Sequence, residues 1–366
     1  MHLKKRIRSG DVNWLMSNVW KFATIPISRA IKHPLSGPII GGIFLLYGCN
    51  YRCLYCDYPE RKHPGKTRLT LEDFYRVIDD YHELGLNGVG FMGGEPLLYR
   101  GLHELIRHAK SKNMTAAITT NGSMTTNEEN AEKLLSTGID MVGISIDGPN
   151  AEINDKIRGV PGSFNNSVLS VKSLINARNK LGSSATFTVN TVLNRQNIEY
   201  VNEMPDFAKS LGADSINIMG VETLAIETDS AEKKDMIQIE KEKAEKIDRI
   251  VDALIERKKK DNMIDNSFAH LRLIRHQFRG EKLPIKCYAG NTSLYVDCYG
   301  DVFPCNAFLE LKRPVANISG GKSLVSIWKS REYQGVRDKI STCRDCYFGC
   351  QNEFNAMLSV KAKFLR

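Results

Sequence analysis

The strongest constraint on the fold is a repeated alternation of short apolar segments with helical patterns. Apolar and β-branched runs predict six strands, over residues 43–47, 88–92, 115–119, 141–146, 186–193 and 215–219. Helical spacing of apolar residues predicts the intervening helices, over residues 71–84, 102–112, 130–137, 163–181 and 199–211. Strands that alternate with helices form right-handed βαβ units, so we expect an α/β fold with a parallel sheet, open or partly closed into a barrel.

The nine cysteines fall into two groups, which favours metal binding. One group directly follows the first predicted strand, and the other lies beyond residue 286: Cys49, Cys53 and Cys56, then Cys287, Cys298, Cys305, Cys343, Cys346 and Cys350. The basic start lacks the pattern of a secretory signal, and the apolar stretch 34–47 is shorter than the ~20 residues that span a bilayer. We therefore expect a cytoplasmic chain with reduced thiols and two separate metal-binding regions.

The first group, with the spacing Cys49-x3-Cys53-x2-Cys56, suits a short loop that presents three thiolates to a cubane cluster. It leaves the fourth iron without a protein ligand, so that an external amino and carboxylate group can chelate that iron. Ligands of parallel sheets bind beyond the carboxyl ends of the strands, which is where this loop falls. Taken alone, the same cysteines would also supply three-quarters of a zinc site.

This spacing resembles the signature of the radical S-adenosylmethionine (SAM) superfamily, including the aromatic Tyr55 before the last cysteine. Further motifs of that family follow in the same order, at or just after strand ends: Gly93-Gly94-Glu95-Pro96, Asn121, Ser145 with Asp147, and Asp155-x2-Arg158-Gly159. The resemblance covers about residues 40–220. It implies a partial (β/α)6 barrel, a [4Fe–4S] cluster held by the three cysteines, and bound SAM.

The resemblance also implies the residues that contact SAM. The Gly93-Gly94-Glu95-Pro96 turn would bind the methionine amino group, Arg158 the carboxylate, and Asn190 with Val192 and Leu193 the ribose and adenine. Besides Val192, the implied set is Tyr55, Gly93, Gly94, Glu95, Asn121, Ser145, Asp147, Arg158, Asn190 and Leu193. From the residues alone, the Gly-Gly motif also suits a plain turn, Asp147 a helix cap and Arg158 a surface position.

The second cysteine group predicts a hairpin that contributes to a four-thiolate site. Cys287 and Cys305 bracket two apolar alternating segments joined at residues 299–301, and Cys343 and Cys346 form a CxxC pair beside a predicted helix. Such a site suits either zinc or a [4Fe–4S] cluster.

The pattern resembles the SPASM or Twitch extension of radical SAM enzymes, which implies an auxiliary [4Fe–4S] cluster. Cys343, Cys346 and Cys350 have the spacing CxxC-x3-C, which is shorter than the SPASM motif CxxC-x5-C-x3-C. This difference favours the Twitch form, with one cluster on Cys287, Cys305, Cys343 and Cys346. Cys298 and Cys350 are then packed thiols or alternative ligands.

These patterns divide the chain into four expected segments. They are a basic amphipathic segment (1–40), the core (41–221), a charged helical connector (222–280), and the hairpin-plus-helix cluster domain with a basic tail (281–366). The connector has an apolar stripe, and we expect a solvated helix between two domains; the stripe comprises Ala244, Ile247, Ile250, Val251, Leu254 and Ile255.

The net charge of +9 is concentrated at the two ends of the chain. Residues 1–33 hold seven basic residues against Asp11 alone, and three more lie in the tail, so residues 34–360 are electroneutral. A neutral body argues against a nucleic-acid partner. The N-terminal apolar and tryptophan residues fit either a helix lying on an anionic membrane, at the inner face, or a helix that plugs the bottom of the barrel.

The resemblance implies an oxidoreductase. A flavodoxin- or ferredoxin-type protein would reduce the first cluster, SAM would yield a 5′-deoxyadenosyl radical, and that radical would remove hydrogen from an unactivated carbon. The auxiliary cluster would accept an electron or bind the substrate.

The 40 residues before the core are fewer than the ~80 of a peptide-recognition domain, so we expect a small-molecule or lipid-like substrate. The alternatives are a maturase of a ribosomal peptide or protein and, in a different class, a non-enzymatic zinc-binding module.

Overall fold

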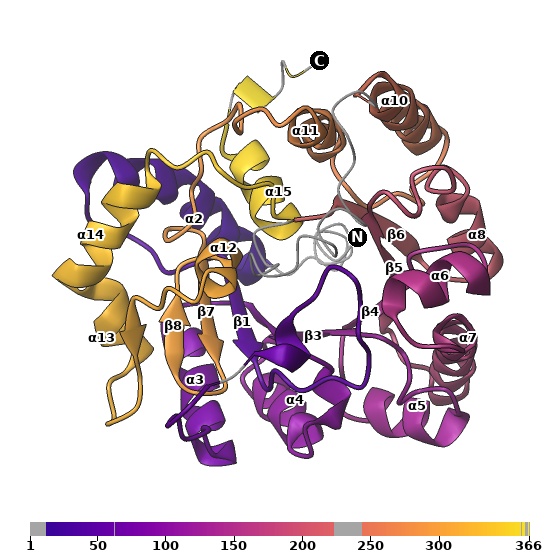
Figure 1. Ribbon diagram of the computed structural model, residues 1–366. Coiled ribbons are helices and arrows are strands. Elements are labelled where there is room, and N and C mark those ends of the chain that lie inside the picture. Colours follow the sequence, from indigo (N-terminus) through magenta and orange to yellow (C-terminus); the bar gives the residue numbers. More distant parts are fainter. Residues whose placement is uncertain (1–11, 62, 223–243, 360, 363–364, 366) are drawn as a thin grey trace.

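The computed structural model describes residues 12–61, 63–222, 244–359, 361–362 and 365, with the backbone alone for residues 12–18. Its centre is one curved, nine-stranded sheet in the order β6-β5-β4-β3-β2-β1-β7-β8-β9, with helices packed around the outside (Figure 1). The six parallel core strands are β1 (Ile40–Phe44), β2 (Gly88–Met92), β3 (Thr115–Thr120), β4 (Met141–Ser145), β5 (Thr186–Leu193) and β6 (Ser215–Gly220). The predicted parallel α/β sheet is confirmed; its two end strands do not pair in the described part of the chain.

The first strand begins earlier than predicted, at Ile40, because glycines form part of it. A Cβ atom on Gly41 would lie 2.5 Å from Leu86, and one on Gly42 would lie 2.6 Å from the Tyr295 ring. Large side chains of the neighbouring elements therefore fill the space that β1 leaves. Glycine usually weakens a strand, and this is why apolar patterning placed β1 too late in the chain.

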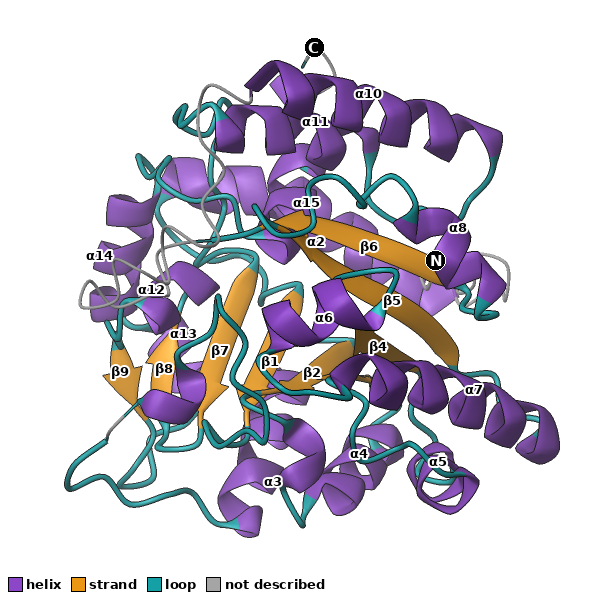
Figure 2. Ribbon diagram, turned by 45° about the vertical axis from the view of Figure 1, so that its right-hand side comes forward, coloured by secondary structure: helices purple, strands orange, loops and turns teal. Residues whose placement is uncertain are grey.

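The predicted outer helices are present as α3 (Leu71–Glu83), α4 (Leu102–Ser111), α5 (Glu128–Leu135), α7 (Ser163–Leu181) and α8 (Met204–Ser210) (Figure 2). A capping box starts α3, since Thr70 and Asp73 accept hydrogen bonds from each other's backbone N–H groups. An additional helix, α6 (Ala151–Arg158), was not predicted. Asn150 caps its start, and the left-handed Gly159, with φ 68°, ends it directly after Arg158.

The C-terminal hairpin extends the core sheet instead of forming a separate sheet. It consists of β7 (Ser293–Asp297) and β8 (Asp301–Phe303), followed by the short β9 (Ala316–Asn317). β7 pairs in parallel with β1 along its whole length, from Ile40 opposite Ser293 to Phe44 opposite Asp297. The helices of this region are α12 (Asn306–Glu310), α13 (Leu324–Lys329), α14 (Arg331–Ile340) and α15 (Gly349–Met357).

The connector packs on the core, so the expectation of a solvated helix was wrong. Its helices are α10 (Ala244–Lys260) and α11 (Phe268–Phe278), while residues 223–243 lie outside the described residues. The apolar stripe of α10 is buried in the main hydrophobic cluster through Ile247, Ile250, Val251, Leu254 and Ile255. Burial of such a stripe supplies the stability that a free helix lacks.

The N-terminal helix α2 (Val12–Ile31) is bonded to the rest of the protein near the amino-terminal edge of the sheet. Lys21 Nζ donates to the carbonyl oxygen of Pro38, at 2.7 Å, and Arg29 donates to that of Cys287, at 2.6 Å. Trp20 and Ile27 on the same helix are at least half exposed. The basic residues 4–8 lie outside the described residues, and none of the described helices combines the length and apolarity needed to cross a membrane.

Candidate active site

The loop that carries the first three cysteines follows β1 and is held by the Gly93-Gly94 turn. Gly94 N donates to Leu46 O at 2.8 Å, and Glu95 N donates to Gly48 O at 3.1 Å. A Cβ atom on Gly93 or Gly94 would lie within 2.2 Å of the carbonyl oxygens of Leu46 and Gly48. The motif is thus more than a plain turn, because only glycine lets this backbone approach the cysteine loop so closely.

Glu95 positions Asn121 beside Cys49, the first cysteine of the loop. Its carboxylate is buried and accepts hydrogen bonds from Thr120 Oγ1 and from Asn121 N, both at 2.8 Å. Asn121 Nδ2 lies 3.8 Å from Cys49 Sγ and donates to Asn50 Oδ1 at 2.9 Å. The turn after β2 and the end of β3 are thereby joined to the cysteine loop.

A buried ion pair supports the second cysteine. Arg158 Nε lies 2.9 Å from Asp147 Oδ2, which also accepts the hydroxyl of Tyr55 at 2.7 Å. Arg158 Nη1 lies 3.8 Å from Cys53 Sγ. Asp147 is fully buried, so it is not a simple helix cap, and Arg158 is not a surface residue.

The last three residues of the implied SAM set lie on β4 and β5. Ser145 and Asn190 are register partners in these strands and are both partly exposed. Leu193 is completely buried in the core, so its side chain has no surface with which to contact a ligand. Val192 lines the cavity instead, because neighbouring residues of a strand point to opposite faces.

We expect Asp147→Ala to lower the free energy of unfolding by about 3–5 kcal/mol, because it leaves the buried Arg158 guanidinium without its counter-charge. Chemical denaturation measures this difference. Lys133→Ala is the matched control, since it breaks an exposed ion pair with Glu129 and should leave stability nearly unchanged. Equal stabilities of the two variants would contradict the role given to Asp147.

The second predicted ligand set is brought together around one cavity. Cys287, Cys305, Cys343 and Cys346 all line it, among apolar side chains that include Phe308 and Phe348. Burial raises the pKa of Cys287 to about 11 and that of Cys305 to about 12, so these thiols must release protons when they bind a metal. Four thiols without another titratable group form a soft donor set that suits an iron–sulfur cluster.

The two remaining cysteines of this region lie outside the four-cysteine cavity. Cys298 is buried in the main hydrophobic core, and Cys350 is exposed on α15. Within the described ranges, no three Cys, His, Asp or Glu side chains converge closely enough to ligate a single metal ion. A four-iron cluster differs from a single ion in that it takes each thiolate at a separate corner.

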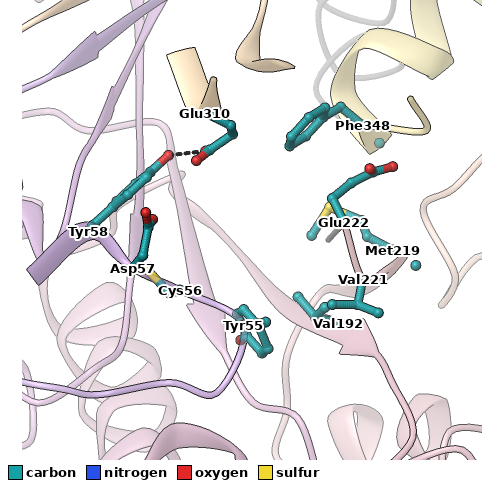
Figure 3. A pocket seen from close by; sticks show the side chains of 12 residues that line it. Tyr55, Cys56, Asp57, Tyr58, Val192, Met219, Val221, Glu222, Glu310 and Phe348 are labelled. Atoms are coloured by element: carbon teal, nitrogen blue, oxygen red, sulfur yellow. Dashed lines mark hydrogen bonds between the residues drawn. The ribbon is translucent and has the colours of Figure 1, made fainter. Parts of the chain in front are cut away.

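A cavity of about 220 Å³ extends from Cys56 of the first set to Phe348 (Figure 3). Cys56 and Tyr58 lie on one side of it, and Glu222 and Phe348 on the other. Phe348 also lines the four-cysteine cavity and therefore separates the two spaces. The strands β1 and β7 are parallel neighbours. The first cysteine set follows β1, whereas Cys287 of the second set precedes β7, so the two sets lie toward opposite ends of these strands.

A buried network ties the cysteine loop to α12, which directly follows Cys305. Arg61 Nη2 lies 2.8 Å from Asp57 Oδ1 and also pairs with Glu310. The hydroxyl of Tyr58 donates to Glu310 as well (Figure 3). Since Asp57 is next to Cys56, these contacts hold the two cysteine sets in a fixed relation.

Glu222 and Phe348 are site residues that the sequence analysis missed. Glu222 Oε1 accepts the backbone N–H of Tyr347 at 2.6 Å and the amide of Gln277 at 3.2 Å. Burial raises the pKa of its carboxyl group to about 7. The position of Glu222, two residues beyond the end of β6, was the available signal, because site residues gather at this edge of a parallel sheet.

We expect Glu222→Gln to gain stability relative to the wild type as the pH rises from 5 to 8. The folded pKa of about 7 exceeds the ordinary 4.5, so the folded chain keeps a proton that the unfolded chain loses in this range. The wild type therefore loses about 2–3 kcal/mol of unfolding free energy across this window, and the glutamine variant does not. Urea denaturation at both pH values measures this, and parallel pH dependences would contradict the burial of a carboxyl group here.

Comparison with known proteins agrees with this geometry. Residues 43–208 match the model of the radical SAM superfamily, and residues 287–347 match that of SPASM, an iron–sulfur cluster-binding domain. Together the two segments make up more than half of the chain. The chain belongs to the radical SAM superfamily. This assignment rules out the alternative of a non-enzymatic zinc module, and the radical SAM core and SPASM domain imply a SAM-binding [4Fe–4S] cluster, SAM, and auxiliary iron–sulfur ligation.

Curated radical SAM relatives cover most of the chain. An AdoMet-dependent heme synthase of Oleidesulfovibrio alaskensis is 27% identical over 78% of this chain and 73% of its own. A PqqA peptide cyclase of Rhodopseudomonas palustris is 28% identical over 88% of this chain and 82% of its own. Among solved structures, Streptococcus suis SuiB bound to its precursor peptide SuiA has a TM-score of 0.66 at 17% identity, covering 100% of this chain and 87% of that one, which shows a shared fold.

Proposed function

We propose that this radical SAM enzyme modifies a ribosomal peptide or protein by removing hydrogen from an unactivated carbon, with one auxiliary [4Fe–4S] cluster taking part. The observation that carries the proposal is the single cavity that extends from Cys56 to Phe348, the wall of the four-cysteine space. A substrate held there lies between the two cysteine sets. This reading replaces the small-molecule or lipid-like substrate as our preferred one.

The similarity of the chain to a peptide cyclase supports a peptide substrate. The PqqA peptide cyclase aligns over both the core and the SPASM region, and SuiB shares the fold in a complex with a peptide. The short N-terminal segment had favoured a small molecule. A peptide-recognition function supplied by a separate protein is compatible with that segment.

In the proposed mechanism the protein binds, orients and shields the reactants. SAM bound at the first cluster supplies the 5′-deoxyadenosyl radical. Cys49, Cys53 and Cys56 would hold that cluster, while Asn121 and Arg158 support Cys49 and Cys53. The contacts that Gly93, Gly94, Glu95, Ser145 and Asn190 make with SAM are part of the proposal.

The auxiliary set would hold a second cluster behind Phe348. Cys287, Cys305, Cys343 and Cys346 are its proposed ligands. This cluster would take up the electron left on the substrate or bind the substrate directly. We propose a flavodoxin- or ferredoxin-type reductant for the first cluster, on the strength of the family resemblance.

A protease-sensitivity experiment tests the substrate class. Extract of the source organism is added to the anaerobically reconstituted enzyme with SAM and dithionite, before and after digestion with a protease that is then inactivated. We expect the extract to stimulate 5′-deoxyadenosine formation, measured by liquid chromatography, and digestion to remove the stimulation. A stimulating fraction that survives digestion, or that partitions into organic solvent, would favour a small molecule or a lipid.

A further inference from the structure

The three carboxylates that line the 220 Å³ cavity differ in whether a cation pairs with them. On one side, Asp57 and Glu310 share the single guanidinium of Arg61. On the other side, no ion pair joins Glu222 to a described cation, and its described hydrogen bonds reach only Oε1, from a backbone N–H and an amide. Figure 3 shows the Glu222 carboxylate beside Phe348, across the cavity from Glu310.

A second carboxylate oxygen on the cavity wall is also without a partner. Asp57 is 8% exposed, and its Oδ2 has no hydrogen-bond partner among the described residues. Its other oxygen, Oδ1, is bonded to Arg61. The lining of the cavity thus contains three carboxylates, and Arg61 neutralises only part of their charge.

An unpaired carboxylate in a desolvated position is unfavourable unless a ligand supplies the missing positive charge. Glu222 lines the cavity, and no described cation pairs with it. A cationic group that entered the cavity would pair with the carboxylate and offset this cost. A neutral or anionic group would instead leave the cost in place or increase it.

We propose that Glu222 binds a cationic group of the substrate, the ammonium of a lysine or amino terminus or the guanidinium of an arginine. This inference deepens the proposed function, on which its peptide form rests. Glu222 is then a residue that selects and positions the substrate between the two cysteine sets.

Binding without turnover tests this proposal. Capped tripeptides Ac-Ala-X-Ala-NH₂ with X as lysine, arginine or the neutral norleucine are titrated calorimetrically into the reconstituted enzyme with SAM and without a reductant. Agmatine is titrated as a cation that is not a peptide. Butanol, which has a four-carbon chain and no charge, is titrated as its neutral control. The proteins are the wild type, Glu222→Gln, and Glu129→Gln, a carboxylate on the distant surface of α5.

We expect the wild type and Glu129→Gln to bind the lysine and arginine peptides about tenfold more tightly than the norleucine peptide. Glu222→Gln, which keeps its shape and its acceptor for Tyr347, should lose this preference. The proposal would be overturned if the wild type bound charged and neutral probes equally, or if it bound none of the probes at about 10 mM. It would also be overturned if Glu222→Gln kept the preference for charged probes.

The probes separate this inference from the peptide function. If agmatine binds in a manner that depends on Glu222 and none of the peptides binds, the cation site stands and its peptide form is overturned. If peptides bind without any preference for charge, the cation site is wrong and the peptide function is unaffected. SAM affinity, measured in the same preparations, should be equal in all three proteins.

Discussion

Replacing Cys49, Cys53 and Cys56 together with alanine is expected to abolish SAM cleavage. The three thiols occupy one loop after β1, where Asn121 lies beside Cys49 and Arg158 beside Cys53, so their loss removes every cysteine ligand that we propose for the first cluster. We expect 5′-deoxyadenosine formation under dithionite to fall by at least about 1,000-fold, to the background of the assay. The iron content should fall by about half, because the four-cysteine site is untouched.

Cys298→Ala is the matched control for this variant. Cys298 is buried in the core and lines neither cavity, so its replacement should leave iron content and SAM cleavage close to those of the wild type. A triple variant that still cleaves SAM would contradict the assignment of the first site. Loss of all iron from the triple variant would show instead that the two sites do not load independently.

The second large effect is expected from Cys343→Ala combined with Cys346→Ala. Both residues line the four-cysteine cavity, and two thiols cannot retain a four-iron cluster that needs four ligands. The iron content should fall by about half, while SAM cleavage without substrate continues at a rate within about threefold of the wild type. Substrate conversion, measured by mass spectrometry with the stimulating fraction, should fall by about 100-fold or more.

Cys350→Ala separates the proposed ligand set from its alternative. Cys350 is exposed on α15 and is not part of the cavity lining, so this variant should keep both clusters and full substrate conversion. An iron loss in Cys350→Ala equal to that of the double variant would make Cys350 a ligand. Retention of all iron in the double variant would remove the four-cysteine site altogether.

The parallel core and the cysteine sites could be predicted because each depends on local sequence. The strands β2 and β5 have the predicted bounds: Val89, Phe91 and Met92 mark β2 despite its two glycines, and β-branched residues dominate β5. The hairpin and the CxxC pair indicated a four-thiolate site, and the resemblance to the Twitch extension selected its members. The structure places all four, Cys287, Cys305, Cys343 and Cys346, around one cavity.

Other features depend on contacts between distant segments. The pairing of β7 with β1 cannot be read from either strand alone, and it makes the hairpin part of the core sheet. Burial of the α10 stripe likewise depends on a partner helix, α11, and on the core. Leu193 was assigned to SAM by resemblance, whereas strand alternation turns its side chain into the core.

The identity of the cavity lining was the hardest part to predict. Glu222, Glu310 and Phe348 come from three separate elements, and no motif in the sequence connects them. Their roles follow from the buried network around Arg61 and from the position of Phe348 between two cavities. Such residues are found only when the fold places them side by side.

The metal and sulfide content of the wild-type chain, purified without oxygen and reconstituted anaerobically, decides whether the chain holds two iron–sulfur clusters. We expect a brown protein with about eight iron and about eight sulfide ions per chain, as two four-iron clusters require, and negligible zinc. A colourless protein that contains zinc and takes up no iron on reconstitution would contradict it.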